Sequence, residues 1–197
     1  MKTLGIIGGL GPETTSEFYL DIVFSSYKKT KKARPGIIIA SVPLPYKIEE
    51  DLIMSNKGAE RYIPFLVNEA KRLEKAGADF IVMPCNSLHV FIDEIRNAVD
   101  IPVLSIIEET VKFLKKNNFN KVGIVSTSAT IQNKLYENAF EEAGIAYETP
   151  DDFQQAKMDK FILNLVTGQQ KNSDREELIK IINDFEKKDV DCVALAC

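Results

Sequence analysis

The strongest constraint on the fold is an alternation of short apolar runs, rich in β-branched residues, with longer stretches of helical periodicity. This alternation is typical of α/β folds, in which parallel strands are buried between helices. The sequence therefore predicts an α/β fold with largely parallel sheets. The expected strands are Thr3–Ile7, Ile37–Val42, Phe80–Met83, Val122–Val125 and Cys192–Ala196. One helix is expected to begin at Pro12, and another to run through Phe91, Ile95 and Val99. The other expected helices are Glu60–Ala76, Ile107–Lys116, Ile131–Ala143, Met158–Val166 and Asp174–Lys187.

Two motifs occur twice, in the same order. Leu4–Gly11 is similar to Val122–Ala129, and Asp79–Cys85 is similar to Asp191–Cys197. In both copies of the second motif the aspartate precedes the cysteine by six positions. A shared order of repeats indicates a duplicated half-molecule. We therefore expect two similar Rossmann-like domains, 1–100 and 101–197, each with a parallel sheet flanked by helices.

Composition narrows the classes of function. The 197 residues suffice for two domains of about 100 residues each. The formal net charge of −4 argues against a nucleic-acid partner. No apolar stretch approaches the roughly 20 residues of a membrane span, and residues 1–12 do not resemble a signal peptide. With only three cysteines and no secretion signal, we expect a reduced, cytoplasmic protein without a membrane partner.

The cysteines at the ends of predicted strands are the candidate reactive groups. In parallel α/β sheets, sites form where strands lead into helices, and Cys85 lies at such a point before Asn86 and Ser87. A helix start stabilises anions, so we expect a thiolate there to have a lowered pKa. Cys192, inside an apolar strand, is expected to be structural. Cys197 is a candidate because the repeat makes it equivalent to Cys85.

Two like groups facing each other suit the inversion of a carbon that carries a hydrogen. One group removes the proton as a base on one face, and the other returns a proton as an acid on the opposite face. A thiolate and a thiol exchange these roles at each turnover. The resulting carbanion needs hydrogen-bond donors nearby. The candidates in the two equivalent loops are Asn86, Ser87, Thr127 and Ser128.

Other motifs are incomplete. Gly9-Leu10-Gly11 follows a strand, as in a dinucleotide-binding loop, but Thr14 stands where the third glycine belongs. No phosphate-binding Walker motif is present. His89 is the only histidine, so a serine–histidine triad or a histidine-based metal site has little support, although His89 could tune a thiolate at Cys85. For an acidic substrate, Lys47 and Lys171 are the cations of interest.

Three motifs resemble the cofactor-independent aspartate/glutamate racemases, and most of all the aspartate racemases. They are Gly5–Pro12, Met83–His89 and Ala196-Cys197. The similarity extends over essentially the whole sequence. It implies a homodimer of two-domain chains, each with its active site in the cleft between the domains. It also implies that Cys85 and Cys197 are the two bases, with neither pyridoxal phosphate nor metal. It further implies interconversion of L- and D-aspartate, or glutamate. The implied substrate contacts are Leu10, Lys47, Asn86, Ser87, Leu88, Thr127, Ser128 and Lys171.

Departures from the family pattern concern specificity and the end of the chain. Lys47 stands where aspartate racemases commonly have arginine, which would lose two-pronged recognition of a carboxylate. The family normally continues beyond the second cysteine, so we expect further residues after Cys197. A maleate-type isomerase, a hydantoin racemase and a non-catalytic binding protein on the same scaffold remain alternatives.

Overall fold

The computed structural model describes residues 2–55, 58–166, 168–169 and 171–196. The chain divides into two compact units, Met1–Ile106 and Ile107–Cys197. The sequence placed a boundary near residue 100, a few residues earlier. The predicted α/β class is confirmed, since the strands form parallel sheets flanked by helices.

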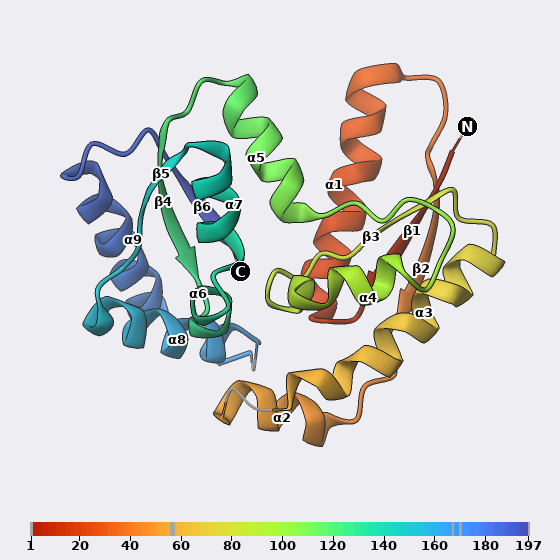
Figure 1. The fold of residues 1–197 in the computed structure, drawn as a ribbon, viewed down its shortest axis with the longest axis horizontal. Coiled ribbons are helices and arrows are strands. Elements are labelled where there is room, and N and C mark those ends of the chain that lie inside the picture. The colour runs from red at the N-terminus through yellow and green to blue at the C-terminus, as the bar shows by residue number, and fades with distance from the viewer. Residues whose placement is uncertain (1, 56–57, 167, 170, 197) are drawn as a thin grey trace. The chain divides into compact units, whose positions relative to one another are not determined.

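The first unit contains a three-stranded parallel sheet in the order β2-β1-β3 (Figure 1). Side chains alternate between the faces of a strand, and β1 shows which helix covers which face. A Cβ atom added at Gly5 would meet Leu73 of α3, whereas one added at Gly8 would meet Thr15 of α1. The two helices therefore cover opposite faces of the sheet. The elements are β1 (Thr3–Gly8), α1 (Pro12–Thr30), β2 (Gly36–Ser41), α2 (Tyr46–Ser55), the 3₁₀ helix η1 (Ala59–Tyr62), α3 (Ile63–Lys75), β3 (Phe80–Val82), the 3₁₀ helix η2 (Ser87–Phe91) and α4 (Ile92–Arg96).

The second unit repeats this strand order as β5-β4-β6, again with parallel pairing. Its central strand is almost entirely buried. The elements are α5 (Ile106–Lys116), β4 (Lys121–Ser126), α6 (Ser128–Gln132), α7 (Leu135–Ala143), β5 (Ala146–Glu148), α8 (Asp152–Val166), α9 (Asn172–Glu186) and β6 (Cys192–Ala196).

The repeated motifs occupy equivalent positions in the two sheets. Gly5 of β1 pairs with Ile81 of β3, and Gly123 of β4 pairs with Val193 of β6. Ile81 precedes Cys85 by four positions, and Val193 precedes Cys197 by four positions. The glycines also have the same role, because each allows a helix to approach the sheet. A Cβ atom would lie 3.3 Å from the Leu73 Cβ at Gly5 and 2.9 Å from the Phe185 ring at Gly123.

The repeated aspartates bond to the start of the central strand in the same way. The Asp79 carboxylate accepts a hydrogen bond from the Thr3 N–H, and the Asp79 N–H donates to the Thr3 carbonyl at 2.8 Å. The Asp191 carboxylate accepts from the Lys121 N–H at 2.9 Å, and the Asp191 N–H donates to the Lys121 carbonyl at 2.8 Å. Each aspartate thus fixes the register in which its strand enters the sheet.

Several predicted elements differ from those observed. The segment after Pro45, where no helix was predicted, forms α2. The helix expected over 131–143 is divided into α6 and α7, because Lys134 has the left-handed φ of 50°. The helix expected through Val99 begins as a 3₁₀ helix and ends at Arg96. β5 was not predicted.

The Asp191 bonds lead to a pH-dependent stability. N–H donors from Asn120 and Lys121 lower the pKa of Asp191 below its usual value. A lowered carboxyl pKa stabilises the fold above the ordinary value of about 3.9, and this stabilisation is lost as the pH falls through the lower native pKa. We expect Asp191→Asn to melt at a lower temperature than the wild type at pH 7, and the difference to disappear toward pH 2.

Thermal denaturation followed by circular dichroism between pH 7 and pH 2 measures this difference. Asp189→Asn is the matched control, because it makes the same change of charge two residues away. A melting temperature for Asp191→Asn equal to that of the control at pH 7 would contradict the assignment.

Candidate functional site

In the first unit, the loop after β1 is held in a fixed conformation. Gly9 has a φ of +82°, and a Cβ atom there would lie 2.5 Å from the Ser41 hydroxyl, so only glycine suits this position. The Gly9 N–H donates to the Thr15 hydroxyl at 3.0 Å, and that hydroxyl donates to the Gly11 carbonyl at 2.9 Å. The loop thereby places Leu10 against the hydrophobic core of the unit.

Cys85 lies just beyond the end of β3, as predicted, and packs against the same core as Leu10. Its N–H donates to the Met83 carbonyl at 2.9 Å, so the chain turns tightly at the cysteine. The residue is half-buried. Leu88 is also brought to this region, but its side chain is only 3% exposed and belongs to the core. Its predicted contact with a substrate stays a prediction.

The segment after Cys85 differs from the expected α-helix. It is the five-residue 3₁₀ helix η2, with Asn86 at its N-cap and no capping bond from the Asn86 side chain. A 3₁₀ helix has fewer aligned peptide groups and poorer hydrogen-bond geometry than an α-helix. The expected effect of a helix start on the thiolate is therefore weakened. Asn86 and Ser87 lie directly beside Cys85, both half-buried.

Tyr62 is a neighbour of Cys85 that the sequence reasoning missed. Its side chain, at the end of η1, is 3% exposed and lies in the same core cluster. Burial raises the pKa of the Tyr62 phenol well above its usual value, and the negative charges of Glu49 and Cys85 raise it further. The phenol is therefore neutral at physiological pH. A buried tyrosine has no signature in a single sequence beyond its apolar neighbours.

His89 connects the cysteine loop to the segment that leads out of the unit. Its ring is 2% exposed, and Nε2 accepts a hydrogen bond from the Ile106 N–H at 3.1 Å. Because Nε2 is the acceptor, the proton of the neutral ring is on Nδ1, which donates to the Cys85 carbonyl at 2.8 Å. His89 therefore contacts the Cys85 backbone. In the same part of the chain, the Arg96 guanidinium donates to the Val103 carbonyl.

In the second unit, the loop after β4 contains Thr127 and Ser128 together, as predicted. The Thr127 hydroxyl caps α6 by accepting from the Thr130 N–H at 3.2 Å. Ser128 donates to the Asp159 carboxylate from its N–H at 2.9 Å and also from its hydroxyl. Asp159, on α8, was not predicted. Its only signal in the sequence was its position four residues after Gln155, whose side-chain amide donates to the Asp159 carboxylate at 3.0 Å.

The cysteines of the second unit were predicted to differ in role. Cys192 lies in β6, half-buried, and burial raises the pKa of its thiol, with Asp191 adding to the shift. A thiol with a raised pKa is a poor nucleophile or base at neutral pH, which agrees with a structural role. Cys197 lies outside the described residues. Ala196, which precedes it, is 1% exposed and pairs with Ser126 of β4.

The two predicted cations have carboxylate neighbours within the chain. The Lys47 ammonium, on α2, lies 2.9 Å from the Asp51 carboxylate, which also bonds to Arg61 at 2.9 Å. Lys171 is at the N-cap of α9, where its N–H donates to the Asp174 carboxylate at 3.0 Å. Lys171 thus lies at the end of the connection between α8 and α9. Recognition of a substrate carboxylate by either lysine stays a prediction.

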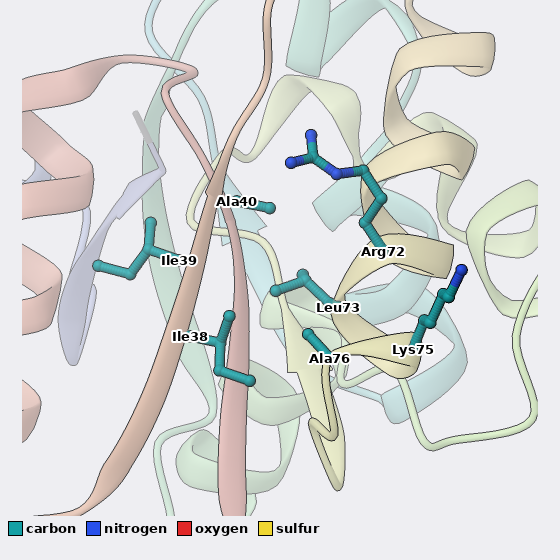
Figure 2. A pocket seen from close by; sticks show the side chains of 7 residues that line it. All are labelled: Ile38, Ile39, Ala40, Arg72, Leu73, Lys75 and Ala76. Carbon is teal, nitrogen blue, oxygen red and sulfur yellow. The ribbon is translucent and has the colours of Figure 1, made fainter.

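A separate pocket of about 410 Å³ lies between β2 and α3. Figure 2 shows Ile38 and Ala40 pointing toward α3 and Ile39 pointing to the other face of the sheet. The predicted site residues do not line this pocket.

Among the residues that the structure describes, no cluster of histidine, cysteine, aspartate or glutamate is arranged to hold a metal ion. The described helices include none with the length and apolar character of a membrane span.

The two bonds of His89 make a testable contribution to stability. His89→Leu leaves the Cys85 carbonyl and the Ile106 N–H without this partner, and an unsatisfied buried polar group costs about 1–3 kcal/mol. We expect the free energy of unfolding in urea to fall by about that amount. His89→Gln should lose less, because its amide oxygen can still accept from Ile106. A His89→Leu variant as stable as the wild type would contradict the assignment.

Comparison with known proteins gives the family. The family model for Asp/Glu/hydantoin racemases matches residues 7–197. The chain is 32% identical over 158 residues to the broad-specificity amino-acid racemase RacX of Bacillus subtilis; the match covers 78% of this chain and 66% of RacX. It is also similar to the structures of an aspartate racemase homologue from Pyrococcus horikoshii (TM-score 0.80, 28% identity) and the aspartate racemase of Picrophilus torridus (TM-score 0.82, 26% identity). Both structural matches cover the whole of this chain, and 85% and 81% of those chains. The chain belongs to the Asp/Glu/hydantoin racemase family.

Proposed function

We propose that the protein interconverts the L and D forms of an amino acid by cofactor-independent proton transfer, with Cys85 and Cys197 as the two bases. The observation that carries the proposal is the duplicated sheet. In both units the strand leading to the cysteine pairs with the central strand in the same register. An equivalent aspartate, Asp79 in the first unit and Asp191 in the second, bonds to the start of the central strand. This duplication supports treating Cys85 and Cys197 as an equivalent pair.

The reaction divides into two proton transfers. The thiolate of one cysteine takes the α-proton of the substrate and becomes a thiol, and the electron pair of the broken C–H bond stays on the α-carbon. The thiol of the other cysteine then donates its proton to the opposite face of that carbon and becomes a thiolate. The reverse reaction exchanges the two roles, so neither direction requires a redox step.

Hydrogen-bond donors near each cysteine would stabilise the carbanion and hold the α-carboxylate and amino group. Asn86 and Ser87 follow Cys85 directly, and Thr127 and Ser128 follow the central strand of the second unit. Because Asp159 already accepts both bonds from Ser128, Ser128 can bind a substrate carboxylate only if that contact is given up. We therefore propose Asn86, Ser87 and Thr127 as the first donors to be tested.

For the substrate we propose aspartate, with glutamate second. The similarity to aspartate racemases supports this choice. The ion pair between Lys47 and Asp51 weakens Lys47 as a clamp for an acidic side chain, and RacX is named as having broad specificity. Neutral and basic amino acids therefore belong in the test. By resemblance to the family, we propose a homodimer.

Separation of the enantiomers by chiral chromatography tests the proposal. The full-length protein is incubated with each L and D amino acid, and we expect the opposite enantiomer of aspartate to accumulate. Loss of a general base or acid typically costs about 10²–10⁴-fold in rate, so Cys85→Ala and Cys197→Ala should each lose that much. Cys192→Ala is the control and should keep the wild-type rate.

Other results would point elsewhere. Turnover of a hydantoin or of maleate, with none of any amino acid, would replace the proposed substrate class. Equal activity in all three cysteine variants, each folded by circular dichroism, would contradict the two-base assignment.

A further inference from the structure

Two side chains of α8 hold the turn that follows β4. Gln155 and Asp159 are four residues apart, so they lie on the same face of the helix. The side-chain amide of Gln155 donates to the Ser126 carbonyl and to the Asp159 carboxylate, at 3.0 Å each. That carboxylate also accepts from the N–H group of Ser128 at 2.9 Å and from its hydroxyl. The residues on both sides of Thr127 are therefore bonded to α8, at the carboxyl end of β4 (Figure 1).

The amide of Gln155 is oriented by these partners. Both partners are acceptors, so Nε2 faces them and uses its two N–H groups on them. The Oε1 atom of Gln155 is buried and accepts from none of the residues that the structure describes. In the neighbouring Gln154, by contrast, Oε1 accepts from the Asp151 N–H at 3.1 Å and Nε2 donates to Asp184 at 3.0 Å. An unsatisfied buried acceptor costs stability, and Gln155 bears that cost while its N–H groups hold the turn.

The equivalent turn of the first unit is held by different residues. The repeat makes Ser126–Ala129 equivalent to Gly8–Gly11. In the first unit, the Thr15 hydroxyl accepts from the Gly9 N–H at 3.0 Å and donates to the Gly11 carbonyl at 2.9 Å. In the second unit, the side chains that hold the turn lie 29 and 31 positions further along the chain. Unrelated residues thus fix the same turn in both units, which indicates that its position matters at the end of each sheet.

We propose that Gln155 and Asp159 are positioning residues for proton transfer by Cys197, an inference that rests on the proposed function. Ser126, whose carbonyl Gln155 binds, pairs in the sheet with Ala196, the residue directly before Cys197 in the sequence. The bonds from α8 therefore fix the end of the strand pair that leads to this cysteine. A displacement of about 1 Å at a reacting group can cost about 10²-fold in rate. In this role both side chains act through the turn and not on the substrate.

The two directions of racemisation distinguish this role from a loss of folded protein. In one direction Cys197 removes the α-proton, and in the other Cys85 removes it. If Cys197 is misplaced, its removal of the proton limits the first direction more strongly, so the isotope effect of an α-deuterated substrate rises. In the opposite direction the slow step becomes the donation by Cys197, which follows removal of the labelled hydrogen, so the isotope effect falls. A smaller fraction of folded protein changes neither isotope effect.

The test measures kcat/KM and the α-deuterium isotope effect in both directions, with the full-length protein and the amino acid that it racemises. Gln155→Leu and Asp159→Asn should each lower kcat/KM by about tenfold to 10²-fold. Because the equilibrium constant of a racemisation is one, this loss is equal in both directions, and the isotope effects carry the test. They should rise in one direction and fall in the other. Gln155→Lys should lose less, because its ammonium can still donate to Ser126 and Asp159.

Gln154→Leu is the matched control, because it removes the same side chain from the same helix but leaves the turn after β4 untouched. It should lower the melting temperature and alter neither isotope effect. Suppose that the wild type racemises an amino acid, yet folded Gln155→Leu and Asp159→Asn keep both isotope effects or change them in the same sense. That result would overturn the inference and leave the proposed function standing. A wild type that racemises no amino acid would overturn both.

Discussion

Both halves of the chain depend on one interaction, the parallel pairing of a central strand with the strand that leads to a cysteine. In each half an aspartate bonds to the N–H and carbonyl groups at the start of the central strand. A shift of one residue would turn every side chain of the strand to the opposite face. The aspartate therefore determines which residue emerges at the far end of the sheet. Cys85 emerges there in the first unit.

The backbone around Cys85 is held from several directions. Met83 supplies an acceptor for its N–H, His89 supplies a donor for its carbonyl, and the hydrophobic core lies behind it. The neutral phenol of Tyr62 adds a buried, uncharged neighbour. A proton-transfer group must be held within a fraction of an ångström of its target. The backbone contacts of Cys85 meet this requirement for the proton-transfer role that we propose for it.

The sequence was sufficient to predict what periodicity and repetition encode. The parallel α/β fold follows from the alternation of strands and helices, and the equivalence of Gly5 with Gly123 follows from the repeat. Features that depend on distant contacts were not predictable. Tyr62 is buried by other parts of its unit, and Asp159 meets Ser128 across 31 positions of sequence. The break at Lys134 carries neither glycine nor proline, so the helix there was predicted to continue.

Lys47 shows where a local pattern was overlooked. The sequence analysis named it as a candidate cation for an acidic substrate. The spacing of four residues between Lys47 and Asp51 is typical of an ion pair on one face of a helix, and α2 contains that pair. The sequence pattern and the resemblance to a family supplied the candidate site residues. The structure supplied the neighbours that those residues already have.

The isotopic outcome of the first turnovers tests the two-base account most directly. L-aspartate is incubated with the full-length protein in deuterium oxide, the enantiomers are separated early, and the α-position of each is analysed by proton NMR. The account predicts deuterium at the α-carbon of D-aspartate, with protium retained in the remaining L-aspartate, because one thiol keeps the abstracted proton while the other donates a solvent-derived deuteron. Equal incorporation into both enantiomers from the outset would indicate a single base and would contradict the account.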